Sequence, residues 1–286
     1  MHPNLTNLFF HTGDIAFLTK HGKEKLVAPI LEPFLGAKIR HADGFDTDSL
    51  GTFTRDVKRI DSQLETARVK ARKGMEITRL SMGLGSEGSF AMDPYHGFIP
   101  WNTEMPVFLD DVHGIELVGI AEGPARVLQR TGRSVEEIVN AAIDFGFPEN
   151  HVIVRPDTMD DSTIVKDIAT VEQLRDAARY CLEASKSGIA CLENDLRAYA
   201  CPTRQEPIRL AAINLLLKAH SLCPACKTPG YWVSRSKRGL PCVHCRLPTD
   251  VPESQVYECH KCGYSSEIKR MDLEFADQGS CEFCNP

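Results

Sequence analysis

Four pairs of cysteines, each with two residues between its members, stand after residue 220. They are Cys223 and Cys226, Cys242 and Cys245, Cys259 and Cys262, and Cys281 and Cys284. Two thiolates on one tight turn can bind the same tetrahedral zinc ion. Joining consecutive pairs leaves 15 and 18 intervening residues, as is usual for paired zinc sites, whereas the middle two pairs are separated by 13. We therefore predict two structural zinc ions in two sequential ribbons, with an interleaved arrangement as the alternative.

The cysteines also bear on the cellular compartment. Eight of the eleven lie in these pairs, and the first residues lack the basic segment and long apolar segment of a signal peptide. Thiols that hold metal are therefore favoured over disulfides, and we expect a cytoplasmic protein. No apolar stretch approaches the roughly 20 residues of a membrane span, so no membrane association is expected.

The cysteine-rich tail has a balanced formal charge before any metal is counted. From His220 onward it contains eight Lys and Arg and eight Asp and Glu. Each four-thiolate zinc site would add about −2, which opposes binding to a phosphate backbone. A basic and aromatic segment that could still contact a single strand consists of Tyr231, Trp232, Arg235, Lys237 and Arg238. Nucleic acid is thus the lesser expectation for the tail.

Acidic and basic side chains also flank a predicted helix-to-strand connection. Ser62 followed by Glu65 forms a capping-box start, and the apolar spacing after it predicts an amphipathic helix that carries Lys70. A short strand over residues 80–85 should then end in an acidic, glycine-flanked turn that contains Glu87. Because α/β folds build sites at the carboxyl ends of strands, we expect chemistry at this turn.

Alternating strands and helices must position these residues. The pattern predicts strands over residues 14–19, 37–41, 52–58, 80–85, 105–110, 115–121, 151–155, 163–168 and 188–192. It predicts helices over residues 20–35, 61–79, 134–145, 170–185 and 207–220, and a loop over 94–106. We expect an α/β domain with a mixed sheet over residues 1–218, followed by a pair of zinc ribbons over 219–286.

Four short motifs carry a resemblance to a known family. They are Glu65-Thr-Ala-Arg-Val-Lys70-Ala, the turn Ser86-Glu87-Gly88, the opening Thr19-Lys20-His21 with Lys23, and Pro202-Thr203-Arg204. The first is similar to the Glu-Asn-Ala-x-x-Lys-Ala helix of the inosine-triphosphate pyrophosphatase superfamily, which hydrolyses non-canonical nucleotides. The others resemble that family's acidic turn, its Thr-x-Asn and lysine opening, and its closing Ser-His-Arg. The resemblance implies a pyrophosphatase-like fold.

The sequence departs from that family at three positions. His21 replaces the asparagine, Lys23 stands one position early, and Glu87 is a single acid where many members have paired aspartates. The whole chain, with its CxxC-rich tail, also resembles an uncharacterised bacterial family that has no assigned activity.

The resemblance implies a Mg²⁺-dependent hydrolase of nucleotides or phosphate esters. Glu65 and Glu87 would be the catalytic acids, holding Mg²⁺ whose water attacks a phosphoryl group. A phosphate-bearing small molecule would be bound by Thr19, Lys20, His21, Lys23, Lys70, Arg197, Thr203 and Arg204. The alternative is a non-enzymatic adaptor, in which the α/β domain is a scaffold and the ribbons bind a protein or nucleic acid. The two differ in whether Glu65 and Glu87 converge.

Overall fold

The computed structural model describes residues 13–50, 61–157 and 163–286, so the strand expected over residues 52–58 lies outside the described residues. The described residues up to Leu216 form one compact unit, and those from Leu217 onward form the other. The boundary falls within the helix α6 (Pro202–His220). No helix in the described ranges is long and apolar enough to cross a membrane.

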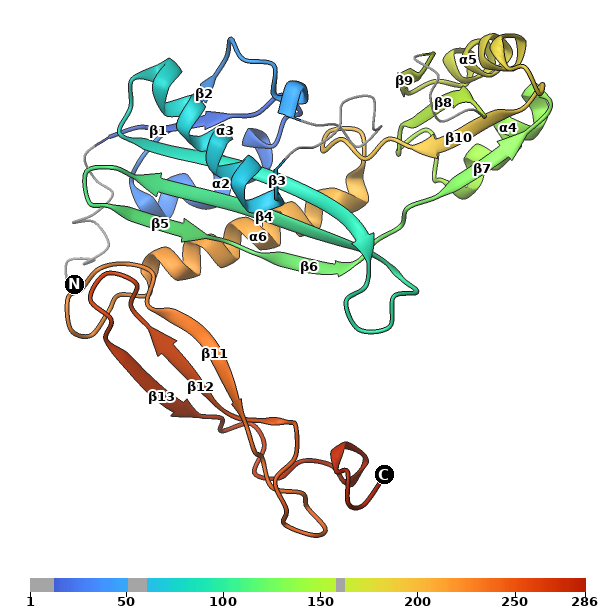
Figure 1. The fold of residues 1–286 in the computed structure, drawn as a ribbon. Coiled ribbons are helices and arrows are strands. Elements are labelled where there is room, and N and C mark those ends of the chain that lie inside the picture. The colour runs from blue at the N-terminus through green and yellow to red at the C-terminus, as the bar shows by residue number, and fades with distance from the viewer. Residues whose placement is uncertain (1–12, 51–60, 158–162) are drawn as a thin grey trace. The chain divides into compact units, whose positions relative to one another are not determined.

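The first unit contains a mixed sheet in the order β2-β1-β3-β4-β5, with β6 also paired to β4 (Figure 1). Its strands are β1 (Ile15–Leu18), β2 (Ile39–Ala42), β3 (Met82–Met92), β4 (Pro100–Asp110), β5 (Ile115–Val118) and β6 (Ala121–Pro124). β1 runs parallel to β2 and β3, whereas β4 is antiparallel to β3 and to β5. The mixed sheet expected from the sequence is thereby confirmed.

The order in which successive strands are added to the sheet changes direction at β1. The helix α2 (Glu24–Leu35) leads from β1 to β2, and the short helix η1 (Thr47–Leu50) and then α3 (Gln63–Thr78) precede β3. β2 and β3 therefore lie on opposite sides of β1. In open α/β sheets, this arrangement leaves a crevice outside the carboxyl end of the central strand, where ligands commonly bind.

Helix α3 packs unusually closely on β3 because two glycines face it. Ser62 caps the helix by accepting a hydrogen bond from the Glu65 backbone N–H, as its sequence predicted. A Cβ atom at Gly85 would lie 1.9 Å from the carbonyl oxygen of Ala67, and one at Gly83 would clash with Met75. Glycine at these positions therefore lets the helix lie directly on the strand.

The strand β3 is longer than its sequence suggests. We expected it to end at residue 85 in an acidic turn, but it continues to Met92 and pairs residue by residue with β4, down to Met92 opposite Pro100. Residues 100–106, expected to be a loop, supply that ladder. Glu87 consequently lies within a strand rather than in an exposed turn, which corrects the prediction.

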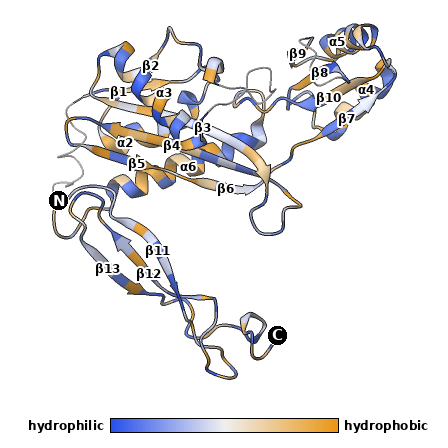
Figure 2. Cartoon of the chain, viewed as in Figure 1, coloured by the Kyte–Doolittle hydropathy of each residue, from blue (hydrophilic) through white to orange (hydrophobic). Residues whose placement is uncertain are grey.

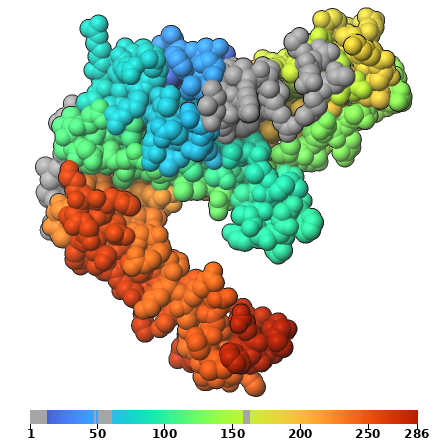
Figure 3. Space-filling model, in the orientation of Figure 1, coloured from blue at the N-terminus to red at the C-terminus, as the bar shows by residue number. Residues whose placement is uncertain are grey.

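The loop that joins β3 to β4 is held by one carboxylate. Asp93 accepts hydrogen bonds from the backbone N–H groups of Tyr95, His96, Phe98 and Ile99, and these bonds hold its pKa well below the ordinary value. The loop stands out on the surface in Figure 3. Its Phe98 residue is 82% exposed.

A second, antiparallel sheet in the same unit has the order β7-β10-β8-β9. Its elements are β7 (Gln129–Gly132), α4 (Val135–Asp144), β8 (Val152–Pro156), β9 (Val165–Ile168), α5 (Val171–Ala184) and β10 (Ala190–Asn194). Ser134 and Thr170 cap the two helices. Figure 2 shows hydrophilic and hydrophobic colour alternating along α5, as expected for a helix with one buried face.

The second unit is built on three antiparallel strands in the order β11-β12-β13. They are β11 (Trp232–Arg238), β12 (Pro252–Glu258) and β13 (Ser265–Lys269), followed by the short helix η2 (Gln278–Ser280). Its hydrophobic cluster is small and consists of Cys223, Tyr231 and Cys259 with Tyr257 packed against them. A core this small favours additional stabilisation by metal.

Candidate functional site

A fully buried carboxylate, Glu104 on β4, holds two cations from distant parts of the chain. The Arg204 Nε atom donates to Glu104 Oε1, and the Lys23 Nζ atom lies 3.0 Å from Oε2. Lys23 also donates to the hydroxyl of Ser86 at 3.1 Å. Both carboxylate oxygens are therefore engaged, and one buried acid joins α2, α6 and the long hairpin.

The elements place these side chains at the carboxyl end of β1. Lys23 is the residue before α2, directly after the turn that follows β1. Arg204 lies in the first turn of α6 and approaches β3 at Gly88, where a Cβ atom would lie 2.1 Å from its Nη2 atom. The absence of a side chain at Gly88 thus makes room for the guanidinium group.

Burial and charge set the protonation of this cluster. Burial lowers the pKa of Lys23 to about 8, although the nearby Glu104 carboxylate acts in the opposite direction. For Glu104, burial raises the pKa, but the charges of Arg204 and Lys23 outweigh it, so the net direction is downward. Glu104 is therefore a permanent anion at neutral pH that keeps both cations in place.

One buried acceptor beside Glu104 has no hydrogen-bond donor among the described residues. The Asn102 Nδ2 atom donates to the carbonyl oxygen of Ser89 at 3.1 Å and to Glu104 Oε1 at 3.2 Å, whereas Asn102 Oδ1 is buried and unpaired. Leaving such an acceptor unsatisfied costs about 1–3 kcal/mol. The position is thus suited to a donor from a water molecule or ligand.

A second ion pair lies on the opposite face of the hairpin. Side chains alternate along a strand, so Glu87 points to the α3 side, away from Ser86 and Gly88. There it pairs with Lys70 of α3, and both side chains are largely buried. The charges of Glu87 and Lys70 also act on Lys23. The two networks therefore form one electrostatic group of three cations and two carboxylates.

Of the expected site residues, the structure brings Lys23, Lys70, Glu87 and Arg204 into this group. It does not bring Glu65, whose side chain is 49% exposed and pairs with Arg68 at 3.1 Å. Arg68 in turn binds Glu116. This network lines a groove of about 500 Å³ beside α3, whose lining also includes Leu109 of β4. Glu65 and Glu87 thus belong to separate networks.

Three further expected residues lie at the surface near the β1–α2 turn and the start of α6. The Thr19 carbonyl oxygen is 2.7 Å from His41 Nε2, and Lys20 pairs with Asp46 at 2.9 Å. Thr203 is exposed, with its hydroxyl 3.3 Å from the thiol of Cys201. None of these contacts reaches Glu104 or Glu87.

Arg197 and His21 meet in a separate aromatic and charged cluster. Arg197 pairs with the buried Asp195 and lies with its guanidinium carbon 5.0 Å from the centre of the Tyr199 ring. The His21 ring lies 6.2 Å from that same ring. Burial is the main cause that raises the pKa of Tyr199 to about 12, so its hydroxyl remains a donor.

Sequence reasoning missed Glu104, Ser86 and Asn102. Glu104 stood in a segment interpreted as a loop, and its two cationic partners are 81 and 100 residues away in the chain. The available signal was an alternation of larger and polar residues from Trp101 to Met105, which is typical of a strand.

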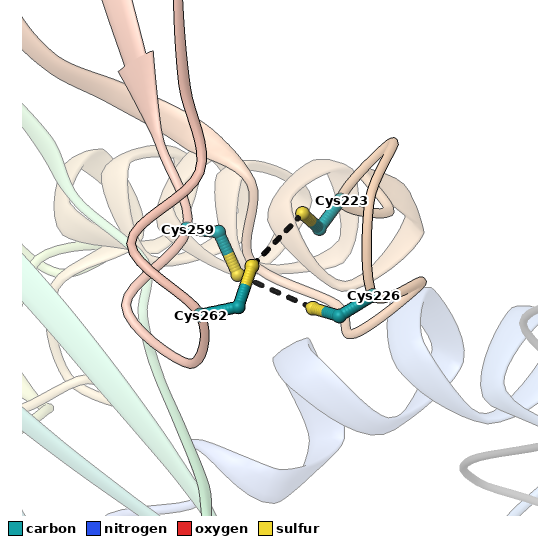
Figure 4. A group of neighbouring side chains, drawn as sticks. All are labelled: Cys223, Cys226, Cys259 and Cys262. Atoms are coloured by element: carbon teal, nitrogen blue, oxygen red, sulfur yellow. Dashed lines mark hydrogen bonds between the residues drawn. The ribbon is translucent and has the colours of Figure 1, made fainter.

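The eight cysteines of the tail form two groups of four. One contains Cys223, Cys226, Cys259 and Cys262, and the other contains Cys242, Cys245, Cys281 and Cys284. In each group all four sulfur atoms lie within 4.8 Å of one another. Figure 4 shows the first group, in which two loops direct their four side chains toward a common centre. All eight are free thiols rather than disulfides.

This grouping corrects the sequential pairing predicted from spacing. β11 leads from the first cysteine pair to the second, β12 leads to the third, and β13 leads onward from the third. A seven-residue strand spans about 23 Å, so consecutive pairs lie at opposite ends of the sheet. Because the strands are antiparallel, the first pair meets the third and the second meets the fourth. The interleaved alternative is therefore the observed one.

The geometry of both groups fits a tetrahedral zinc ion. Zn–S bonds of about 2.3 Å place neighbouring sulfurs about 3.8 Å apart. The Sγ atoms are 3.7 Å apart in Cys223 and Cys262, and 3.6 Å apart in Cys226 and Cys259. In the other group, the separations are 3.9 Å between Cys242 and Cys284 and 3.5 Å between Cys245 and Cys281. The two groups are thus compatible with two structural zinc ions.

Hydrogen bonds at the cysteine turns prepare some sulfurs to be thiolates. The Thr228 hydroxyl and backbone N–H lower the pKa of Cys226 to about 6. In contrast, hydrogen bonding to Cys245 and burial raise the pKa of Cys284 to about 12. Four crowded sulfurs cannot all ionise without a compensating cation, and a divalent metal ion would supply that charge.

A resident magnesium ion does not fit the donor set of the described residues. Within the described ranges, these two cysteine groups are the clusters of three or more His, Cys, Asp and Glu side chains that converge on a metal position. Glu87 and Glu104 already pair with cations, and Glu65 lies in another network. Mg²⁺ is usually held by one or two carboxylates together with water and substrate phosphates, and these three carboxylates are engaged in ion pairs.

Fold and sites together define a mixed α/β protein with a tail that contains two interleaved four-cysteine groups. The chain belongs to the family described as a domain of unknown function (DUF6671), whose model matches residues 70–286. No curated protein matches the chain, and no solved structure does. The expectation of an uncharacterised family with a zinc tail is thus confirmed, whereas the likeness to the inosine-triphosphate pyrophosphatase superfamily rests on its short motifs alone.

Proposed function

We propose that the group around Glu104 and Glu87 binds the phosphoryl groups of a nucleotide or another phosphate ester and hydrolyses it. One observation carries the proposal. Lys23, Lys70 and Arg204 come from three separate elements and lie, largely buried, beside two carboxylates on the two faces of the β3–β4 hairpin near the carboxyl end of β1. Three cations against two anions leave a net positive charge, which is suited to an anionic ligand.

The position of the cluster supports the same ligand class. It lies at the switch point of the parallel strands, where open α/β sheets commonly bind ligands. The unpaired Asn102 oxygen adds an acceptor for a ligand hydroxyl or N–H group. Glu104 and Glu87 hold the cations in place before the ligand arrives, which reduces the ordering cost of binding.

The test is a screen for release of phosphate and pyrophosphate from canonical, deaminated and modified nucleotides and from simple phosphate esters. Each substrate is assayed with and without Mg²⁺, since the pyrophosphatase resemblance implies that ion. Stabilisation of the protein by pyrophosphate, measured as a rise in Tm, reports binding independently of turnover. Absence of both turnover and stabilisation for every compound would refute the proposal.

Lys70 provides the variant that locates the site. Replacing Lys70 and Glu87 together by glutamine removes both charges without leaving one buried and unpaired. We expect kcat/KM to fall by at least about 10²-fold. The matched control is Lys73→Gln on the same helix, where the lysine is exposed and pairs with Glu76. An equal loss of kcat/KM in the Lys70 and Glu87 double variant and in Lys73→Gln would show that the activity resides elsewhere.

A second candidate function is protein binding by the tail. Its apolar side chains include Met271, which is 96% exposed, and Phe283, which is 73% exposed. Nucleic acid is disfavoured, because Lys237 and Arg238 of the basic segment pair with Glu267 and Asp250.

We also propose that residues 1–218 and 219–286 are separate domains. Removal of zinc by a chelator should then abolish only one of two thermal transitions.

A further inference from the structure

A histidine and an aspartate from the second sheet form a pair that the proposed phosphate site does not use. The Nδ1 atom of His151 lies 2.8 Å from Asp167 Oδ1. A carboxylate only accepts hydrogen bonds, so Nδ1 carries a proton, and in the neutral ring Nε2 presents a lone pair. No hydrogen bond to Nε2 occurs among the described residues, and the His151 side chain is 24% exposed. His151 is therefore oriented as a proton acceptor.

A bulge in β9 orients Asp167 toward His151. Val154 pairs with Val165 and Val152 with Ile168, so β9 contains one residue more than the facing stretch of β8. Asp167 lies in this bulge with a φ of 63°, in the left-handed region that a non-glycine residue adopts at a cost. Its backbone N–H donates to the buried Asp195 at 3.3 Å, which holds the conformation.

Two more side chains fix the carboxylate of Asp167. Besides burial, the Asp167 carboxylate contributes to raising the pKa of the Tyr199 hydroxyl, and the Arg197 Nη2 atom lies 3.6 Å from Oδ1. The Tyr199 ring also packs edge-on against the His151 ring, with 6.1 Å between the ring centres. Asp167 is thus held from three sides, and His151 is held by both the carboxylate and the ring.

The pair is connected to the phosphate site through one short segment. The Tyr199 Cβ atom lies 3.8 Å from the position that a Cβ would take at Gly22, directly beside Lys23. The Arg204 Nη1 atom donates to the carbonyl oxygen of Leu196, next to Arg197. The residues that orient His151 and those that hold the phosphate-binding cations are therefore parts of one continuous structure.

We infer that His151 is the general base of the hydrolysis and that Asp167 is its positioning residue, an inference that rests on the proposed function. His151 Nε2 takes a proton from water as the water oxygen forms its bond to phosphorus. The bond between phosphorus and the leaving oxygen breaks, and its electron pair stays on that oxygen. The imidazolium then returns the proton to the leaving group or to solvent, so that the base is regenerated.

The competing explanation is that the pair only fastens the segment 195–204 to the second sheet. The two explanations differ in what His151→Gln changes. A general base acts in the chemical step, so kcat should fall by about 10²–10⁴-fold while ligand-induced stabilisation is retained. A purely structural fastening would change Tm and ligand stabilisation together.

The experiment measures kcat, KM and pyrophosphate-induced stabilisation for His151→Gln, His151→Ala and Asp167→Asn on the best substrate of the screen. We expect a loss confined to kcat, and partial recovery of His151→Ala by added imidazole. Asp167→Asn should lose less than His151→Gln, again in kcat. The matched control is His96→Gln, an exposed histidine beside another aspartate, which should behave as wild type.

The outcomes separate this inference from the function on which it rests. Full activity of His151→Gln in a protein that turns substrate over refutes the general base but leaves the hydrolase. If His151→Gln loses both kcat and ligand-induced stabilisation, the role of His151 is structural, and the general-base inference is also refuted. Wild-type protein that neither hydrolyses nor binds any compound refutes the proposed function, and the inference fails with it.

Discussion

Lys23→Met isolates the energetic cost of placing a charged lysine inside the Glu104 cluster. The lysine is fully buried, and its pKa is lowered from 10.5 to about 8, chiefly by burial. Methionine has a similar length and no charge, and Glu104 keeps its ion pair with Arg204. The variant therefore removes one titration without leaving the carboxylate unpaired.

The sign of the effect follows from proton binding. Below pH 8, Lys23 is protonated in both the folded and the unfolded chain, so folding bears the full cost of burying the charge. Between about pH 8 and 10.5 only the unfolded chain binds the proton, so the free energy of unfolding rises with pH. At 1.36 kcal/mol per pH unit, this window contributes about 3 kcal/mol.

Thermal unfolding of the zinc-loaded wild type and of Lys23→Met across pH 7–10.5 measures this contribution. Each kcal/mol shifts Tm by about 2–4 °C in a unit of this size, so wild type should gain about 6–12 °C relative to the variant. Cysteines, tyrosines and surface lysines titrate alike in both proteins and cancel. Lys73→Met, which removes an exposed lysine, should follow wild type.

A Tm difference between wild type and Lys23→Met that stays constant across this pH range would refute the reasoning. It would mean that the lysine titrates equally in the folded and unfolded chains, and hence that the cluster is open to solvent.

The interleaved zinc sites predict that Cys226→Ser combined with Cys262→Ser leaves one zinc per chain by elemental analysis, whereas Cys226→Ser combined with Cys245→Ser leaves none. Sequential sites would give the opposite result. Gly85→Ala should destabilise the first unit by about 2 kcal/mol or more in chemical unfolding, because its Cβ would overlap the Ala67 carbonyl. An unchanged unfolding midpoint would show that α3 can move away.

Local signals were sufficient to predict the helices. Ser62 and Ser134 cap their helices, as their sequence contexts indicated. Lys70 and Glu87 were each singled out from motifs, and the structure pairs them. The helix predictions succeeded because helix caps and side-chain periodicity depend on residues within one or two turns, whereas the roles of Lys70 and Glu87 stay predictions.

The buried acid and the extent of β3 could not be predicted in this way. A charged residue in the middle of a strand is tolerable only when its partners are already in place, and the partners of Glu104 come from the first and last elements of the unit. The mutational expectation for Glu87 changes accordingly. A surface acid could be neutralised at little cost, whereas Glu87→Gln now leaves Lys70 largely buried without its partner, so we expect a loss of stability.

The cysteine spacing was misleading for a related reason. It measures distance along the chain, but the extended strands between the pairs convert 15 intervening residues into separation rather than proximity.

The interleaved grouping has a consequence for the order in which the protein can be completed during synthesis. Cys223 must wait for Cys262, 39 residues later, before its metal site can close. At about 5–20 residues per second, that interval lasts roughly 2–8 s. When residue 245 has emerged, the chain displays four thiols that belong to two different sites, and these four could capture one ion together. For each zinc ion to reach its own site, exchange of zinc between thiols must therefore remain faster than folding. This condition holds until β12 pairs with β11 and brings the first and third cysteine pairs together.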